Sequence, residues 1–542
     1  MNTTTFTRVV VIGATVLFFV LATDGRLHWD EPAYLYSGAF LSTHEILSGG
    51  YQPSGIDSFY ISRVLHVLLI HGITQLTGPG MVGFYAVILT YFAMLLLTLI
   101  MAYRLLKLLQ DSDPTDSSGL KLAVAVACFS PIFLYLSFKT LPEIPALLFV
   151  VLASYALLKA MLGHPLIWLS LSALCLAATA LTKNTMIILY VSLVLSMLVC
   201  QLGSFRPLRL ILYSTLSGCG SLILFFGFLQ ATGISLDQYF GYVDQLLKLN
   251  DSFVQRFIEG AMELGSYALF LILAISAFRS TLARFYIVWF LIATLPILLF
   301  FGRTEARYLA ANVIPLIGII AIGLRVGVDY LLRFQPMVRI TAAAVVVVFL
   351  VTSDWLTLKF MEHEVNYHDI KKAVNRLDND YQEKDNYTIL TPWAYTDFHI
   401  LRFMYPDHRI YSVRDYDLDR PKRPAEYVEN LKKMQQQYIK PYLMASPQQL
   451  HLLDNTPVIY FGFIENFSIE NIQRLFKKLS AKRALAKFNA MSLNNHLTVS
   501  WLWYDPDFEL QPFFESGHYK IFRVIPIDDQ SLPSPLERTR RK

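Results

Sequence analysis

The sequence predicts a polytopic α-helical membrane protein with about eleven transmembrane helices, followed by a soluble C-terminal α/β domain. Hydrophobic residues make up 54% of the 542 residues and charged residues only 16%, whereas soluble domains carry about 25% charged residues. The apolar residues also come in runs of about 17–25, which is the length that a helix needs to cross about 30 Å of hydrocarbon. The net charge of +5 is small for this length and does not suggest a nucleic-acid binder.

The predicted transmembrane spans are distributed over the first two thirds of the chain. We expect the first to be a retained helix and not a signal peptide, because it lacks an Ala-x-Ala-type cleavage sequence and Asp24-Gly25-Arg26 follows it directly. The spans are 6–23, 80–103, 121–138, 144–162, 165–181, 185–202, 209–232, 264–279, 285–301, 308–325 and 340–357.

Residues 59–76 are apolar but contain Arg63, His66 and His71. Their apolar residues fall on one helical face, which is typical of an amphipathic helix at the membrane surface. A transmembrane reading remains the alternative, but it would reverse every later loop and break the distribution of Lys and Arg. We therefore predict an interfacial helix here, and a second one in the loop 233–262 with Tyr239 and Phe240.

The orientation follows from Lys and Arg in the short loops, which favour the cytoplasmic side. This rule predicts a cytoplasmic N-terminus and a periplasmic or extracellular C-terminal domain; the compact loops fit a bacterial inner membrane. The predicted domains are a membrane domain over 1–357 with a first outer loop at 24–79, a soluble α/β domain over 358–526, and a flexible tail over 527–542.

Two acidic positions lie on the predicted outer face. Asp30 and Glu31 follow the first span, and Glu143 begins a later span in the sequence Leu-Pro-Glu-Ile-Pro. Each has a purely structural alternative, because Asp30 suits a helix N-cap and Glu143 a helix N-terminus. Ionisable residues at membrane depth are nonetheless functional candidates.

Cationic residues lie on the same predicted face. Lys183 separates two spans, and Arg303, Arg307 and Tyr308 share one short loop with a single carboxylate, Glu305. Snorkelling of the lysine and interfacial anchoring by Arg and Tyr are the structural alternatives. Cations beside carboxylates at this depth suit a substrate with a phosphate headgroup and a lipid tail. A nucleotide donor fits poorly, because no phosphate-binding glycine motif follows a strand.

The chain resembles the GT-C superfamily of membrane glycosyltransferases, and especially its protein O-mannosyltransferase-like and lipid A aminoarabinose-transferase-like branch. The matching residues are Asp30-Glu31, Leu-Pro-Glu-Ile-Pro at 141–145, Leu-Thr-Lys-Asn at 181–184 and Ala-Arg-Tyr-Leu at 306–309. The resemblance implies inverting transfer of one sugar from a polyprenyl-phosphate donor to a lipid, glycan or protein acceptor on the outer face. It covers roughly residues 1–330, and the Lys-Pro-Pro element of some relatives is absent.

The resemblance also implies roles for individual residues. Asp30 would be the general base with Glu31 alongside, and Glu143 would assist the acceptor or a divalent metal, for which His28 and His66 are further candidate ligands. Donor phosphate binding would involve Lys183, Arg303, Arg307 and Tyr308. The alternative functions are a flippase or transporter for a lipid-linked saccharide, or a polysaccharide ligase or polymerase.

Overall fold

The fold is described from a computed structural model of the whole chain. It describes residues 26–27, 30–48, 62–110, 118–128, 130–137, 139–201, 205–240, 267–300, 306–333, 335–336, 341, 365–380, 387–391, 399–408, 410–412, 440–445, 508–516 and 519–526. The chain forms two compact units. The first comprises Met1–Thr23, Ser37–Thr77 and Tyr85–Met361, and the second comprises Asp24–Tyr36, Gly78–Phe84 and Glu362–Lys542.

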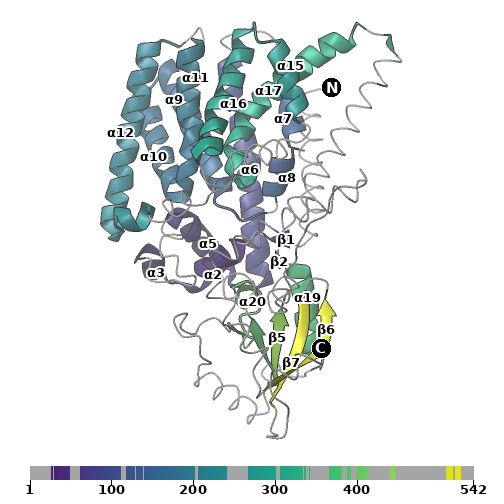
Figure 1. Cartoon of the computed structure of the whole chain (residues 1–542). Coiled ribbons are helices and arrows are strands. Elements are labelled where there is room, and N and C mark those ends of the chain that lie inside the picture. Colours follow the sequence, from purple (N-terminus) through teal and green to yellow (C-terminus); the bar gives the residue numbers. More distant parts are fainter. Residues whose placement is uncertain are drawn as a thin grey trace. The chain divides into compact units, whose positions relative to one another are not determined.

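The first unit is a bundle of apolar helices that run side by side (Figure 1). Helix α9 contacts α10, α11 and α12, whereas α17 contacts α7, α15 and α16. The longer helices are α6 (Met81–Gln110), α9 (Glu143–Leu162), α10 (Pro165–Lys183), α11 (Ile188–Cys200), α12 (Pro207–Thr232), α16 (Thr281–Phe300) and α17 (Val313–Leu331). The shorter ones are α3 (Thr43–Ser48), α5 (Val64–Thr77), α7 (Ser118–Ala127), α8 (Pro131–Leu136) and α15 (Ala268–Ser276).

Six helical segments of the described residues are long and apolar enough to cross a membrane. The chain is therefore an integral membrane protein, as its composition predicts. Helices α6, α9, α12, α16 and α17 correspond to predicted spans. The sixth segment, Pro165–Cys200, contains α10 and α11 with the 3-10 turn η1 (Asn184–Ile187) between them. The predicted spans 6–23 and 340–357 lie outside the described residues.

Two predicted spans have a different structure. The described residues of 264–279 form the nine-residue helix α15 followed by a turn. Residues 121–138 form two short helices, α7 and α8, and not one continuous helix. Pro131 begins α8, and proline is accepted in the first turn of a helix but not in its interior. An apolar run therefore continues across a helix break that hydropathy alone does not reveal.

Helix α5 covers most of the segment that the sequence predicts as an interfacial helix. Its 14 residues are fewer than the ~20 that a span requires. Leu65, Leu68 and Leu69 of the predicted apolar face are partly exposed, and the buried residues are Val64, His66, Val67, Ile70 and Thr74. The protein-facing side of α5 is therefore mixed, with His66 and Thr74 among apolar residues.

Close helix packing depends on small residues. A Cβ atom at Gly318 of α17 would overlap the ring of Tyr286 on α16. Tyr286 is fully buried, as is its neighbour Trp289, whose indole N–H donates to the carbonyl oxygen of Leu189 on α11 (3.2 Å). Gly318 thus allows α17 to approach α16 closely.

The second unit contains a mixed five-stranded sheet with strand order β4-β3-β5-β7-β6. Strand β3 is parallel to β4 and β5, whereas β7 is antiparallel to β5 and β6. Helix α19 (Tyr367–Asp380) packs beside β6 and β7 (Figure 1). The strands are β3 (Tyr387–Thr391), β4 (Ile410–Ser412), β5 (Lys440–Ala445), β6 (Phe508–Ser516) and β7 (Tyr519–Pro526), and α20 (His399–Met404) precedes β4.

Two early segments of the chain belong to this second unit. Strand β1 (Arg26–Leu27) pairs antiparallel with β2 (Val365–Asn366). The N–H of Gly80 donates to the carbonyl oxygen of Phe403 in α20 (2.7 Å). Asp30 and the first turn of α2 (Glu31–Phe40) therefore belong to the same unit as the C-terminal sheet.

Candidate functional site

A buried ion pair lies at one end of the helical hairpin formed by α9 and α10. Glu143 is the first residue of α9, after Pro142 at its N-cap, and Lys183 is the last residue of α10. The Nζ of Lys183 is 2.9 Å from Oε1 of Glu143, and the two side chains are 4% and 0% exposed. A carboxylate at a helix N-terminus and an ammonium at a helix C-terminus each complement the helix dipole.

The geometry of the hairpin explains why these residues meet. Glu143 lies 20 residues before Gly163, and Lys183 lies 19 residues after His164, the residues that join the two helices. Both arms rise about 1.5 Å per residue, so their far ends return to the same level about 30 Å from the turn. The ion pair therefore lies at the depth where an apolar span ends.

His66 of α5 is part of the same cluster. A hydrogen bond joins the hydroxyl of Tyr91 on α6 and Nδ1 of His66 (2.7 Å). Burial lowers the pKa of His66 well below its ordinary value, and the nearby charges of Arg63 and Lys183 lower it further. His66 is therefore neutral at pH 7 and supplies a polar group without adding a third cation beside Arg63 and Lys183.

Tyr239 approaches the same end of α10 from the segment after α12. Its hydroxyl donates to the carbonyl oxygen of Ala180, and its ring packs edge-on against Phe225 (5.0 Å between centroids). Burial raises the pKa of Tyr239, whereas the charge of Arg63 lowers it. The predicted interfacial helix in 233–262 is described only as far as Phe240, and there Tyr239 points into the protein.

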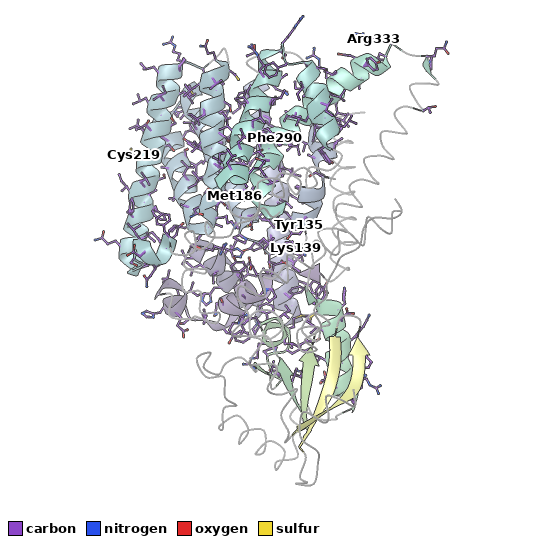
Figure 2. All side chains as sticks on the ribbon, in the orientation of Figure 1. Tyr135, Lys139, Met186, Cys219, Phe290 and Arg333 are labelled. Carbon is purple, nitrogen blue, oxygen red and sulfur yellow. The ribbon has the colours of Figure 1, made fainter. Side chains whose placement is uncertain are left out.

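Lys139 is a buried cation that the sequence analysis did not single out. It is fully buried, with Nζ 5.7 Å from the centroid of the Tyr135 ring. Figure 2 places Lys139 and Tyr135 toward one end of the helical unit and Arg333 at the opposite end. The loops that contain Lys139 and Arg333 therefore lie toward opposite ends of the helical unit.

The early acidic pair belongs to the second unit. Asp30 and Glu31 are both buried, and the carbonyl oxygen of Asp30 accepts from the N–H of Tyr34 in the first turn of α2. The ring of Tyr36 lies on that of His399 in α20, with 4.7 Å between centroids. Residues of the C-terminal region thus hold the helix that Asp30 precedes.

The remaining predicted site residues are described less fully. Arg307 and Tyr308 lie in the 3-10 turn η3 (Ala306–Asn312). At these two positions the structure describes the backbone. Arg303 and His28 lie outside the described residues. The described residues contain no group of three His, Cys, Asp or Glu side chains that could hold a metal. Because Lys183 already compensates the charge of Glu143, this donor set does not favour a dication, and we derive no step through a metal.

Known proteins are similar to this chain in part of its sequence and in its fold. The model of the dolichyl-phosphate-mannose-protein mannosyltransferase family matches residues 64–229, which include His66, Glu143 and Lys183. A search of curated proteins gave no match. The structure is similar to ArnT from Cupriavidus metallidurans in the apo state, with a TM-score of 0.53 and 14% identity over 96% of this chain and 98% of that chain.

Two further solved structures extend this similarity. ArnT from the same organism bound to undecaprenyl phosphate has a TM-score of 0.53 and 13% identity, with the same coverage of 96% and 98%. The oligosaccharyltransferase of Archaeoglobus fulgidus in the apo form has a TM-score of 0.50 and 12% identity, over 81% of this chain and 69% of that chain. The chain has the fold of the GT-C membrane glycosyltransferases. At these identities the structural likeness establishes the GT-C fold alone.

Most of the buried cluster lies in the segment that the family model matches. The cluster consists of Arg63, His66, Tyr91, Glu143, Lys183 and Tyr239. The segment matched by the family model begins at Val64, the first residue of α5, and ends within α12. It therefore contains every member of the cluster except Arg63 and Tyr239, as well as Lys139. Arg63, Tyr91, Tyr239 and Lys139 were not predicted as site residues, and the position of Lys139 four residues before Glu143 was the available signal for the last of them.

Proposed function

We propose that the protein transfers a sugar from a polyprenyl-phosphate donor to a lipid, glycan or protein acceptor on the outer face of a membrane. The observation that carries this proposal is the buried Lys183–Glu143 ion pair, which lies within the segment matched by the mannosyltransferase family model in a chain of GT-C fold. The undecaprenyl phosphate bound by ArnT of C. metallidurans supports a donor of this class.

The leaving group defines the role of the cations. When the bond between the sugar C1 and the phosphate oxygen breaks, the phosphate changes from a diester with one negative charge to a monoester with nearly two. A buried ammonium beside that oxygen stabilises the developing charge more effectively than water would. Lys183 is our candidate for this role, and Glu143 positions it and compensates its charge in the absence of donor. Arg303, Arg307 and Tyr308 would contact the remaining phosphate oxygens.

The acceptor requires a base. The acceptor hydroxyl oxygen attacks C1 from the face opposite the phosphate, its proton passes to a carboxylate, and polyprenyl phosphate departs with inversion at C1. Asp30 is our candidate for the base and Glu31 for a neighbouring carboxylate. No second carboxylate is required as a nucleophile, because the displacement is direct, and phosphate is a good leaving group that needs no general acid. The contacts of α20 with Tyr36 would hold α2 in position for this step.

A flippase for lipid-linked saccharides and a polysaccharide ligase or polymerase remain the competing functions. The decisive experiment incubates the purified protein, in detergent or in vesicles, with a panel of polyprenyl-phosphate sugars and measures which donor is consumed. Consumption with formation of polyprenyl phosphate identifies a transferase, whereas movement of intact donor between leaflets identifies a flippase. Products that carry more than one added sugar per acceptor identify a polymerase.

Two variants test the proposed base. Asp30→Asn should abolish transfer but retain folding and donor binding, because an amide cannot take up the acceptor proton. Asp407→Asn is the matched control, since Asp407 is an exposed aspartate of the same unit. Full transfer by Asp30→Asn would remove Asp30 from the mechanism.

A further inference from the structure

Asn312 is a fully buried amide at the junction of η3 and α17. It is 0% exposed, and neither its Oδ1 nor its Nδ2 has a hydrogen-bond partner among the residues that the structure describes. An uncharged buried side chain is seldom left in this state, because both of its polar groups lose water without replacement. The burial of Asn312 therefore needs an explanation, which is either a structural role of the amide or a bound ligand.

Helix capping does not supply that reason. Asn312 occupies the N-cap position of α17, where an asparagine side chain normally accepts from the N–H of the second or third helical residue. The third helical residue here is Pro315, which has no N–H. The backbone of Asn312 is also helical (φ −79°, ψ −12°), whereas a capping residue is usually extended, and its side chain makes no capping hydrogen bond.

The neighbouring turn contains a second side chain of the same kind. Turn η3 contacts η1, and Oγ1 of Thr185 in η1 is likewise enclosed without a hydrogen-bond partner among the described residues. Turn η1 directly follows Lys183, and η3 also contacts α9, which begins at Glu143. Met186 of η1 is fully buried and is labelled in Figure 2. Two unsatisfied polar side chains thus lie on two contacting turns that adjoin the ion pair.

The chemistry of these groups indicates what they bind. An amide and a hydroxyl each both donate and accept hydrogen bonds, whereas a phosphate group only accepts them. A phosphate would satisfy Nδ2 of Asn312 but leave Oδ1 without a partner. Sugar hydroxyl groups both donate and accept, so they can donate to Oδ1 and accept from Nδ2 of the amide. We propose that Asn312 and Thr185 hydrogen-bond the hydroxyl groups of the transferred sugar, next to the phosphate held by Lys183.

This inference rests on the proposed function and assigns sugar specificity within that site. The principal variant is Asn312→Leu, which keeps the size of the side chain and removes both polar groups. The second is Thr185→Val. The matched control is Thr179→Val, the same substitution at a buried threonine of α10 whose Oγ1 already donates to the carbonyl oxygen of Cys175 (2.8 Å). Melting temperature, transfer of the best donor, and binding of polyprenyl phosphate without sugar are measured for each.

We expect Asn312→Leu and Thr185→Val to melt at or above the temperature of the wild type, since no internal hydrogen bond is lost. Their kcat/KM for transfer should fall about tenfold or more, the effect of losing one hydrogen bond in the transition state. Binding of sugar-free polyprenyl phosphate should not change. Thr179→Val should transfer like the wild type.

Other outcomes would overturn the inference. A large drop in melting temperature for Asn312→Leu would show a structural role, and a parallel loss of polyprenyl-phosphate binding would assign the amide to the phosphate. Unchanged kcat/KM in both variants would remove these residues from the site. If the wild type consumes no polyprenyl-phosphate sugar, the proposed function itself fails, whatever the variants do.

Discussion

The Lys183–Glu143 pair allows the roles of charge in stability and in function to be separated. At 2.9 Å and an effective dielectric constant of about 20, the two charges attract by about 6 kcal/mol. Removing both ions from water costs several kcal/mol for each, so the net contribution of the intact pair is small. Removing one partner leaves the other charge buried and uncompensated, which costs about 3–5 kcal/mol.

We therefore expect Lys183→Met and Glu143→Gln each to lower the free energy of unfolding by about 3–5 kcal/mol. The double variant, which has neither charge, should remain within about 1–2 kcal/mol of the wild type, so the two effects should be strongly non-additive. Unfolding in mixed micelles of a mild detergent and dodecyl sulfate, followed by tryptophan fluorescence, measures these differences.

Activity should follow a different order from stability. The double variant should be stable but unable to transfer sugar, because the cation beside the leaving phosphate is missing. Lys159→Met is the matched control, since Lys159 lies in the last turn of α9, at the opposite end of the hairpin, with Nζ 5.7 Å from the centroid of the Tyr155 ring. Lys159→Met should keep the stability and the transfer activity of the wild type. Additive stability effects would refute the coupling, and wild-type transfer by the double variant would refute the phosphate role of Lys183.

Three further predictions concern His66, Gly318 and His399. The folded state should lose stability as the pH falls below about 6.5, by at most about 1.4 kcal/mol per pH unit. His66 takes up a proton in the unfolded chain, whereas burial and the charges of Arg63 and Lys183 keep it neutral in the folded protein. His66→Gln should flatten this part of a melting-temperature profile, and an unchanged profile would contradict a neutral His66 in the folded state. Gly318→Ala should destabilise by about 1–3 kcal/mol through overlap with Tyr286, whereas Gly227→Ala, where a Cβ meets nothing within 4 Å, should be neutral or slightly stabilising in thermal unfolding. His399→Leu removes a ring pair worth about 0.5–1.5 kcal/mol and should slow transfer about 2- to 10-fold with donor binding unchanged; equal rates would show that α20 does not position α2.

Local composition predicted the parts of the fold that depend on it. The spans 80–103, 144–162 and 209–232 appear as α6, α9 and α12 because a long apolar run can satisfy its backbone in a membrane only as a helix. In the C-terminal region, four strand-like runs alternate with two helical runs, and this alternation is what predicts an α/β domain. Two of the strand-like runs, 387–390 and 519–524, appear as β3 and β7. The other two, 458–463 and 497–502, lie outside the described residues, as do the predicted helical runs 424–437 and 469–488.

Elements that depend on neighbours were harder to predict. Strand β6 alternates between apolar and polar residues at 508–511, yet it was not predicted as a strand, and Pro512 weakens the signal. The structure explains the proline, since β6 lies at the edge of the sheet and its register shifts between Pro512 and Phe514. The burial of Lys139 against Tyr135 likewise depends on a tertiary contact.

The ion pair is a tertiary contact, but the lengths of the two helical arms that carry it can be read from the sequence. The predicted topology places Glu143 and Lys183 on the same face of the membrane but does not pair them. A turn at Gly163-His164 gives two arms of nearly equal length, and equal helical arms return to the same level. An acidic residue at the start of one arm and a basic residue at the end of the other then lie at the same level, and in an apolar setting the cost of separating their charges favours contact. Topology thus gives the side of the membrane, whereas the lengths of consecutive spans specify which charges meet.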